Sequence, residues 1–364
     1  MSTRSSPTSS ANARAANARR IAAVGVVGAA LGGALLLPHL AHAHALIGHL
    51  RGTPYVTGFD SLDHPLEVLF ALGDGQSFVA LARDPTLSNL TQFRGARGQA
   101  ALRADRPLQG YLGWVFSAGN PTAAEGGVVA ASLFGAGLAA AGCGELLRRR
   151  GRSPWLGLLV LILPSAIAGL RAFGPEFVGL GFVCFGLAMK DERKTWAAVL
   201  FFALAGLSRE TYLLVPLLFA FKERRYLIPI ATWLAWTGIV WLRFGAWGPT
   251  VTLDGTRLLV PPLFGFTHAL HELQSPVATI LCMVAIPVAV IATLDRRRHD
   301  PLTRIVVAYG LFSIFFDWVV WVFWASFTRT LLPLFAFSLI ALAGKNTVEL
   351  SPVVETGGLD PLPS

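Results

Sequence analysis

The residues whose types and spacing suit chemistry lie in a polar, Arg-rich stretch, Gly73 to Pro121, between two long apolar runs. Asp74 stands between two glycines, which allow a tight turn that presents its carboxylate. A carboxylate in this position is able to take a proton from a reacting hydroxyl group. Asp74 is therefore our candidate catalytic residue, and Gln76 is a candidate substrate-binding residue. A turn Asp without a catalytic role fits the same Gly-Asp-Gly sequence.

Two arginines follow in the same stretch. Arg103 and Arg106 lie three positions apart, so on a helical turn they share one face. Two guanidiniums near a membrane surface suit a phosphate group, because each planar fork donates paired hydrogen bonds. The alternative is that both side chains only extend toward the lipid headgroups. The spacing predicts a phosphate-binding pair.

Further ionisable residues interrupt apolar segments, where an unpaired ion costs several kcal/mol. Arg209 and Glu210 are adjacent, and we expect them either to pair with each other at a turn or to bind substrate. Arg329 is expected near the external face, where it binds a substrate phosphate or Asp317. Asp317 is expected to be buried against another helix. Glu176 belongs to the same class of residues, which either serve a function or form a structural ion pair.

The composition indicates an integral membrane protein. Of 364 residues, 54% are hydrophobic and 14% are charged, and the mean hydropathy is +0.57, whereas about 25% of residues in soluble domains are charged. The net charge of +9 does not indicate a nucleic-acid partner, because Arg and Lys fall in short runs beside apolar segments, as in cytoplasmic loops. The three cysteines lie in apolar runs and have neither disulfide nor metal spacing.

The N-terminus leads into the first apolar run. Residues 1–18 are small, polar and basic, so we expect a disordered cytoplasmic segment. The run Ile21 to Leu40 is long enough to cross a hydrocarbon core of roughly 30 Å. The small residues that follow also fit a cleaved signal, which is the alternative to an uncleaved first span. Both interpretations place residue 47 onward outside the cell.

Four histidines near this boundary raise the question of a metal site. His39, His42, His44 and His49 are two to five positions apart. Residues two apart on a helix do not face each other, and no carboxylate accompanies the group. We therefore expect polar residues at the membrane interface and no metal site.

The predicted fold is an all-α integral membrane protein with about ten transmembrane segments and both termini in the cytoplasm. The polytopic domain covers residues 19–344, and 345–364 form a cytoplasmic tail. Residues 47–121 form an external loop, and 245–274 form a second external segment. Within the first loop we expect surface helices at Pro65 to Leu72, Gln76 to Ala82 and Pro107 to Ser117.

Most expected spans are single apolar runs of helical length. One segment, Thr195 to Phe221, lies between two basic clusters that must both be cytoplasmic, yet it is too short for two full spans. We expect a hairpin of two short or tilted helices that turns at residues 208–210. The other expected spans are Gly127 to Leu147, Trp155 to Leu170, Glu176 to Met189, Tyr226 to Phe244, Pro276 to Leu294, Leu302 to Val322 and Leu331 to Ala343.

The order of several short motifs resembles polytopic GT-C-type glycosyltransferases, mannosyltransferase-like enzymes that use polyprenyl-phosphate-linked sugars. Leu204 to Glu210 is similar to a Leu-Thr-Arg-Glu element of such proteins, and Arg329 to Pro333 is similar to their last spans. The residues that resemble their first external loop are Asp74-Gly75-Gln76, Phe78, Ala82, Asp84-Pro85, Arg103, Arg106-Pro107-Leu108 and Gly119-Asn120-Pro121.

This resemblance implies a hexosyltransferase of the plasma (inner) membrane that moves a sugar from a polyprenyl-phosphate donor to an extracytoplasmic acceptor, either a cell-envelope glycan or a glycolipid. It gives Asp74 the role of the base. The sequence has no glycine-rich nucleotide-binding fingerprint. A divalent cation at Asp74 is compatible with the sequence but not required by it.

Two other functions stay open: a transporter or flippase for a lipid-linked or anionic substrate, and a GT-C relative without activity. An outward-facing arrangement that joins Asp74 to the arginines favours transfer. A pathway that opens to both membrane faces and is lined by Asp317 and Arg209 favours transport.

Overall fold

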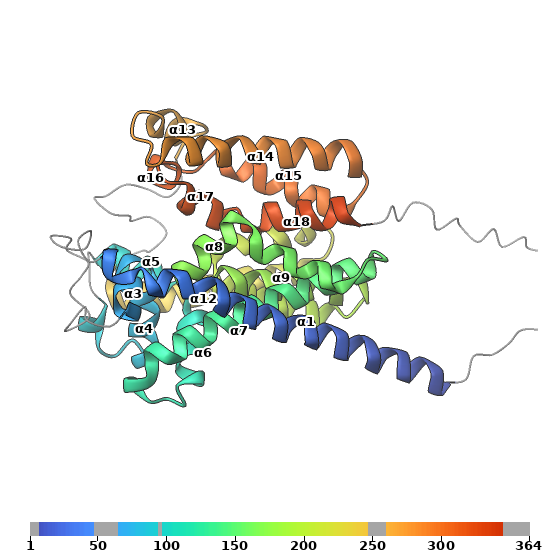
Figure 1. Cartoon of the computed structure of the whole chain (residues 1–364), viewed down its shortest axis with the longest axis horizontal. Helices are drawn as coiled ribbons and strands as arrows, with labels where there is room; N and C mark the ends of the chain where they lie inside the picture. Colours follow the sequence, from blue (N-terminus) through green and yellow to red (C-terminus); the bar gives the residue numbers. More distant parts are fainter. Residues whose placement is uncertain (1–6, 47–64, 94–96, 247–259, 345–364) are drawn as a thin grey trace, which may run out of the picture.

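The computed structural model describes residues 7–46, 65–93, 97–246 and 260–344, and every regular element among them is a helix. The long helices run roughly parallel to the long axis of the molecule (Figure 1). Pro7 and Gly344, the two ends of the described chain, lie at the same end of the molecule. The helices of the first loop, α3, α4 and α5, lie at the opposite end.

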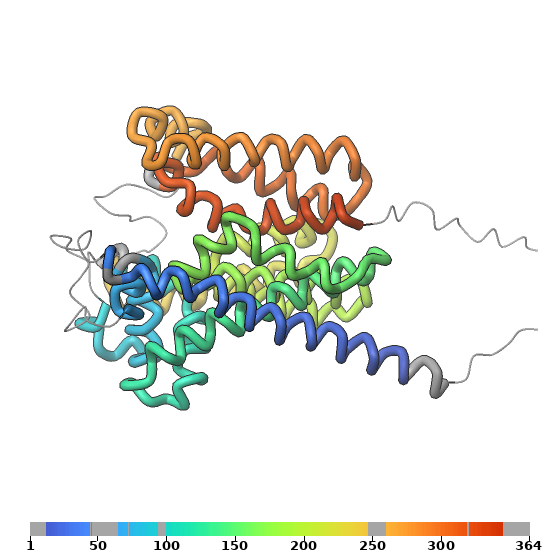
Figure 2. Tube along the Cα trace, in the orientation of Figure 1, coloured from blue at the N-terminus to red at the C-terminus, as the bar shows by residue number. Residues whose placement is uncertain are grey.

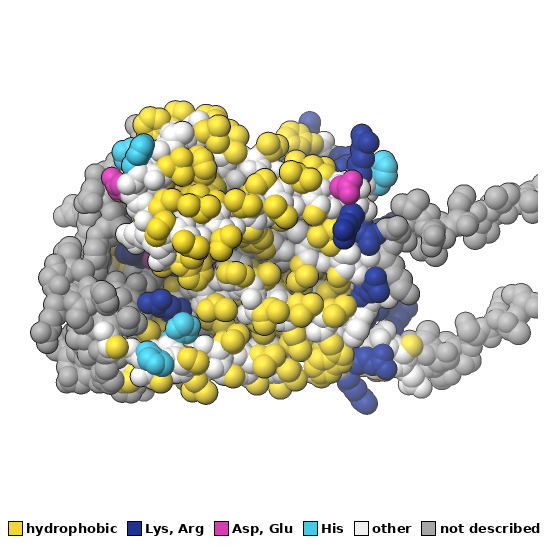
Figure 3. Space-filling view, turned by 45° about the horizontal axis from the view of Figure 1, so that its top comes forward, with side chains coloured by type: hydrophobic (Ala, Val, Ile, Leu, Met, Phe, Trp, Pro, Cys, Tyr) yellow, Lys and Arg dark blue, Asp and Glu magenta, His cyan; other side chains and the backbone are white. Residues whose placement is uncertain are grey.

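Four helical segments are long and apolar enough to cross a membrane, and six are if each of two bent pairs counts as one span. An apolar band occupies the middle of the molecule, and Lys and Arg gather at the end where the described termini lie (Figure 3). A membrane location follows from this composition. The four long helices are α1 (Pro7–Ala41), α7 (Ala124–Arg149), α12 (Ile228–Phe244) and α14 (Pro276–Arg297).

The two bent pairs owe their breaks to proline. Leu163 has the extended backbone that a residue before proline adopts (φ −64°, ψ 140°), and the axes on either side of it differ by 68°. Pro333 cannot donate the helical hydrogen bond to the carbonyl of Arg329, and the bend there is 60°. The expected third span, Trp155 to Leu170, is therefore bent at Leu163 and is not one straight helix. The pairs are η4 (Pro154–Ile162) with α8 (Pro164–Arg171), and α17 (Trp324–Thr330) with α18 (Leu332–Ala343).

The expected hairpin between residues 195 and 221 is confirmed. Its two ends lie together. The Lys190 ammonium is 4.3 Å from the centre of the Phe219 ring, and the Arg225 guanidinium is 5.3 Å from the centre of the Trp196 ring. At the turn between the two helices, Arg209 has an extended backbone conformation (φ −158°, ψ 131°). The helices involved are α9 (Glu176–Asp191), α10 (Thr195–Ser208), η5 (Glu210–Leu213), α11 (Leu214–Ala220) and η6 (Arg224–Leu227).

The N-terminal segment differs from the prediction. Helix α1 already begins at Pro7, so residues 7–18 are helical and not disordered. The reason is local: this segment is rich in Ala, the strongest helix former, and it continues the first apolar helix without a break. Residues 1–6 of the expected disordered segment lie outside the described residues.

The expected span from Leu302 to Val322 is also shorter in the structure. Helix α15 (Pro301–Ser313) ends at Ser313, and the chain then turns into the short helix α16 (Trp318–Trp321). Asp317 caps α16, because its carboxylate accepts a hydrogen bond of 2.7 Å from the N–H of Trp318. Asp317 thus lies in a connection between two helices and not within a span.

The three helices expected in the first loop are present, each begins within one residue of its expected position, and α5 is an additional helix between them. Every residue of α4 except Gln76 and Arg83 is buried, so α4 is not a surface helix. In the second external segment, Asp254 and Arg257 lie outside the described residues. The first-loop elements are η1 (Ala43–Leu46), α3 (Pro65–Leu72), α4 (Gly75–Arg83), η2 (Leu90–Gln92), α5 (Arg97–Ala104), α6 (Pro107–Phe116) and η3 (Pro121–Ala123), and the second segment contains α13 (Phe264–Ala269).

Small residues let the N-terminal helices approach closely, which is a common way to pack helices in lipid. A Cβ on Gly28 of α1 would lie 2.7 Å from the Cβ of Ala140 on α7. On the opposite side of α7, a Cβ on Gly135 would lie 2.7 Å from a methyl group of Val178 on α9. Neither position leaves room for a larger side chain.

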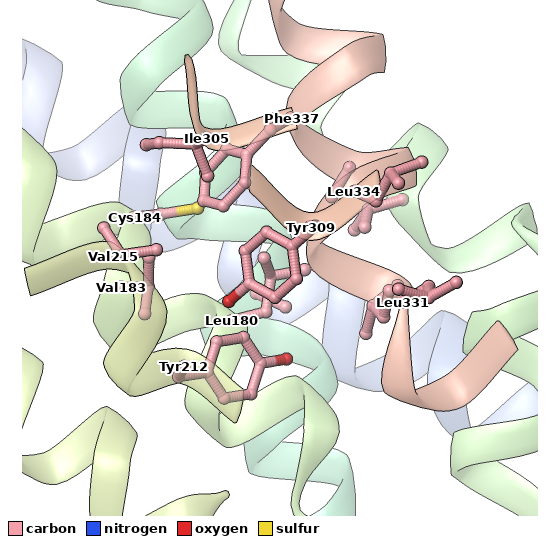
Figure 4. Close-up of a cluster of buried hydrophobic side chains, with 14 of the residues drawn as sticks. Leu180, Val183, Cys184, Tyr212, Val215, Ile305, Tyr309, Leu331, Leu334 and Phe337 are labelled. Atoms are coloured by element: carbon pink, nitrogen blue, oxygen red, sulfur yellow. The ribbon is translucent and has the colours of Figure 1, made fainter. Parts of the chain in front are cut away.

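The C-terminal helices α14, α15 and α18 stack on the layer that contains α8 and α9 (Figure 2). Buried aromatic and aliphatic side chains fill the junction, where Tyr212 of η5 lies beside Tyr309 of α15, surrounded by Leu180, Leu331 and Leu334 (Figure 4). The Tyr309 hydroxyl donates a hydrogen bond of 2.9 Å to the carbonyl of Thr211. The turn of the hairpin is thereby fixed to the C-terminal helices.

Candidate functional site

Asp74 lies in the tight turn between α3 and α4. Its neighbours must be glycine because other chain segments approach closely: a Cβ on Gly73 would lie 3.1 Å from the Cα of Ala172, and one on Gly75 would lie 2.5 Å from the Phe70 ring. Asp74 precedes the first residue of α4, but its side chain makes no capping hydrogen bond. The interpretation as a turn Asp therefore does not explain its carboxylate.

Two arginines from distant parts of the chain contact this carboxylate. Arg103 Nε donates to Asp74 Oδ1 over 3.1 Å, and Arg329 Nη2 donates to Oδ2 over 3.1 Å. All three side chains are less than a fifth exposed. The ends of α5 and α17 thus meet at the turn before α4.

A second pair lies close by. Arg106 binds Glu210 with both arms of its fork, Nε to Oε2 over 2.9 Å and Nη2 to Oε1 over 2.7 Å. This contact joins the N-terminal end of α6 to the turn of the hairpin, 104 positions along the chain. Arg106 also interacts electrostatically with Asp74.

The third pair is buried most deeply. Arg209 donates from Nη1 to Glu176 Oε1 and from Nη2 to Thr330 Oγ1, the latter over 2.7 Å. Arg329 Nε lies 3.7 Å from the same Glu176 oxygen, which connects this pair to Asp74. We call the seven residues the Asp74 network: Asp74, Arg103, Arg106, Glu176, Arg209, Glu210 and Arg329.

The Asp74 network carries more positive than negative charge. Four guanidiniums face three carboxylates, a net charge of +1. Burial alone raises the pKa of Asp74, but Arg329, Arg103 and Arg106 outweigh it, so this pKa lies well below its usual range. Asp74 is ionised at neutral pH, and the network has the charge to accept an additional anion.

Asp105 is a nearby acid that the sequence did not single out. Its side chain is 1% exposed, and neither carboxylate oxygen has a hydrogen-bond partner among the described residues. Burial, with a further contribution from Glu210, raises its pKa to about 8 despite the opposing effect of the Arg106 guanidinium. Asp105 is therefore protonated at pH 7. An Asp before Arg-Pro at the start of a helix resembles an ordinary turn residue, so no sequence signal distinguished it.

Several expected partners differ from the structure. Arg103 and Arg106 do not share a helical face, because α5 ends at Ala104 and the two arginines contact different carboxylates. Arg209 and Glu210 do not pair with each other, since the extended backbone at Arg209 sends their side chains to Glu176 and Arg106.

Two further expectations concern the ends of the site. Arg329 contacts Asp74 and not Asp317, which caps α16. Gln76 lies half-buried on the first turn of α4, two residues from Asp74. The Asp74 network thus contains every candidate residue that the sequence suggested except Gln76, although most pairings are new.

The charges around Asp74 do not fit a metal cofactor. No group of three or more His, Cys, Asp or Glu suitable for a metal ion occurs in the described part of the chain. Asp74 supplies one carboxylate, and two guanidiniums already occupy its oxygens. A divalent cation would meet positive charge on both sides of Asp74.

The fold and site define a helical membrane protein with a buried, Arg-rich charge network at one end. Comparison with protein-family models, curated proteins and solved structures finds no match for this chain. The arguments about function therefore depend on the Asp74 network itself.

Proposed function

We propose that the protein is a GT-C-type hexosyltransferase that moves a sugar from a polyprenyl-phosphate donor to a cell-envelope glycan or glycolipid. The reaction would occur at the outer face of the plasma membrane. The chain would cross the membrane about ten times, with both termini in the cytoplasm. The gathering of Lys and Arg at the end where the described termini lie supports this orientation.

The observation that carries the proposal is the contact of Asp74 with Arg103 and Arg329. Sugar transfer from a lipid phosphate needs a base for the acceptor hydroxyl and cations for the departing phosphate. In the Asp74 network the candidate base, Asp74, is hydrogen-bonded directly to the candidate cations, Arg103 and Arg329.

The reaction assigns a role to each group. Asp74 takes the proton from the acceptor hydroxyl, whose oxygen forms a bond to the anomeric carbon. The bond between that carbon and the donor phosphate oxygen breaks, and polyprenyl phosphate leaves with its electron pair. Arg103 and Arg329 stabilise the negative charge that develops on the phosphate.

The contacts with arginine also suggest how Asp74 becomes a better base. With both guanidiniums bound, its pKa is too low for efficient proton transfer. A donor phosphate would draw Arg103 and Arg329 toward itself, which weakens their hold on Asp74 and raises the pKa of its carboxylate. Donor binding would thus precede activation of the acceptor.

Transport is less well supported. The residues of the Asp74 network converge on the turn before α4, and Asp317 has a local explanation as the cap of α16. Arg209 is held by Glu176 and Thr330 and is 6% exposed. These positions suit a reaction site at one face more than a pathway to both.

The test is a reconstituted transfer assay with Asp74→Asn. This change removes the base at nearly constant volume, and we expect the transfer rate to fall by a factor of about 10² to 10⁴. Glu125→Gln is the matched control: Glu125 is an acid of the same external region, which pairs with Arg83, and its variant should keep its activity. Full activity of Asp74→Asn would move catalysis elsewhere.

A labelling experiment tests the orientation. Single cysteines at Arg193 and Arg224, in a background without Cys143, Cys184 and Cys282, should react with a membrane-impermeant thiol reagent only from the cytoplasm. Arg193 precedes α10 and Arg224 follows α11, so the two positions lie at the two ends of the hairpin, which are close together. Labelling from opposite faces, or from outside only, would contradict the proposed orientation.

A further inference from the structure

A second group of basic side chains lies outside the Asp74 network, where α1 packs against α8. His39 is in the last turn of α1, His42 is the residue after its C-terminal end, and Arg171 is the last residue of α8. His39 interacts electrostatically with both Arg171 and His42. The Nδ1 of His42 lies 2.8 Å from the carbonyl of Pro38, so Nδ1–H donates there and Nε2 stays free.

This group lacks an anion among the described residues. No carboxylate of the described chain forms an ion pair with His39, His42 or Arg171, and Arg171 makes no hydrogen bond to a described residue. Neighbouring groups that all bear or gain positive charge repel each other. Such an arrangement is stabilised by an anion from outside the described chain.

The location identifies the class of anion. The apolar stretch of α1 ends at Ala41, so the group lies where a span meets the bilayer surface. Basic and His side chains gather at this edge of the apolar band (Figure 3). Leu31 on α1 is 41% exposed and offers apolar surface about two turns before His39. A ligand with a phosphate at the surface and acyl chains below it matches both features.

We propose that His39, His42 and Arg171 bind the phosphate of an anionic phospholipid whose acyl chains lie along α1 at Leu31. The fork of Arg171 donates to the phosphate oxygens, and the free ring nitrogens of the histidines add further donors. This site is separate from the Asp74 network and does not depend on sugar transfer.

Native mass spectrometry of the full-length protein in detergent tests the proposal, with phosphatidylglycerol as the probe and uncharged diacylglycerol as the lipid control. We expect bound phosphatidylglycerol in the natural protein, about tenfold weaker binding in Arg171→Gln and a smaller loss in His42→Gln. Arg243→Gln is the matched control, because Arg243 is an exposed arginine at the end of α12 nearest to α5. That variant should bind like the natural protein.

Arg171→Lys is the control for misfolding of the Arg171→Gln variant. It keeps the positive charge, so it should bind phosphatidylglycerol better than Arg171→Gln while its unfolding temperature stays that of the natural protein. If Arg171→Gln does not fold, His39→Gln and His42→Gln together give the same test. Equal binding by the Arg171→Gln and Arg243→Gln variants would overturn the proposal. Complete displacement of the lipid by millimolar inorganic phosphate would also overturn it, since the ligand would then be a soluble anion.

Discussion

The two ends of the molecule both contain arginine–carboxylate pairs, yet the pairs differ in how they are linked to one another. In the Asp74 network, Glu176 is fully buried and the pairs join elements up to 255 positions apart. At the end where the described termini lie, which we call the basic end, Glu145 pairs with Arg148 and Arg149 of its own helix. Glu192, which is 35% exposed, pairs with Lys194.

The arginines of the basic end also have structural partners. Arg152 donates over 2.6 Å to the carbonyl of Ala343, and Arg297 donates to that of Gly344, so both complete the C-terminal end of α18. Such contacts explain why arginines gather there without any ligand. Burial does not separate the two ends, because Arg150 and Asp300 at the basic end also form a pair between distant elements and are each 13% exposed. The Asp74 network differs in that Arg329 contacts both Asp74 and Glu176 and thereby links two pairs.

The largest expected difference between the two ends is in stability. Glu176→Gln leaves the buried guanidinium of Arg209 without its counter-ion, and we expect a loss of about 3–5 kcal/mol of unfolding free energy. Glu192→Gln at the basic end should cost less than about 1 kcal/mol. Denaturant titration in detergent measures both. Equal losses would mean that the two ends do not differ in the way proposed.

The next effect concerns pH. The pKa of Asp105 is raised to about 8 in the folded protein, so this state holds a proton that the unfolded chain has lost above its ordinary pKa. Stability should therefore fall as the pH rises, by about 2–3 kcal/mol between pH 5 and pH 7, and level off above pH 8. Asp105→Asn should remove this slope.

Asp84→Asn is the control for that experiment. Asp84 lies in the same external region, and although burial opposes it, bonds from Asn89, Thr86 and Ser88 lower its pKa, so it is ionised throughout this range. The variant should lose stability without changing the slope. A natural protein whose stability does not change between pH 5 and pH 7 would contradict protonation of Asp105.

The smallest expected effect is on donor binding. Arg103→Gln removes one guanidinium that we assign to the phosphate, and the donor concentration for half-maximal rate should rise about tenfold. Arg83→Gln is the control, because Arg83 pairs with Glu125 in the same external region. An unchanged donor dependence in Arg103→Gln would remove the phosphate role of Arg103.

The sequence predicted much of the helical arrangement because local signals encode it. Basic clusters and segment length together required the hairpin at residues 195–221, and apolar spacing gave the first-loop helices α3, α4 and α6. The break at Pro164 was readable in principle, since proline interrupts a helix and restricts the residue before it. The start of α1 at Pro7 was also predictable in principle, because the high helix propensity of the alanines in residues 7–18 outweighs the polar composition of that segment.

The pairings of the site were not predictable from the same signals. Arg329 reaches Asp74 because α17 bends away from α18, and Arg209 reaches Glu176 because the hairpin turn is extended. Both contacts depend on the relative placement of helices far apart in the sequence. The burial of Asp105 has the same origin, since residues of α12 such as Trp236 cover the segment before it.

The most direct test of the account is a structure of the protein with polyprenyl phosphate bound. We expect the phosphate oxygens within hydrogen-bond distance of Arg103 and Arg329, with Asp74 released from at least one of these two arginines. A phosphate bound beyond the reach of both, with Asp74 still holding both guanidiniums, would contradict the proposed role of the Asp74 network.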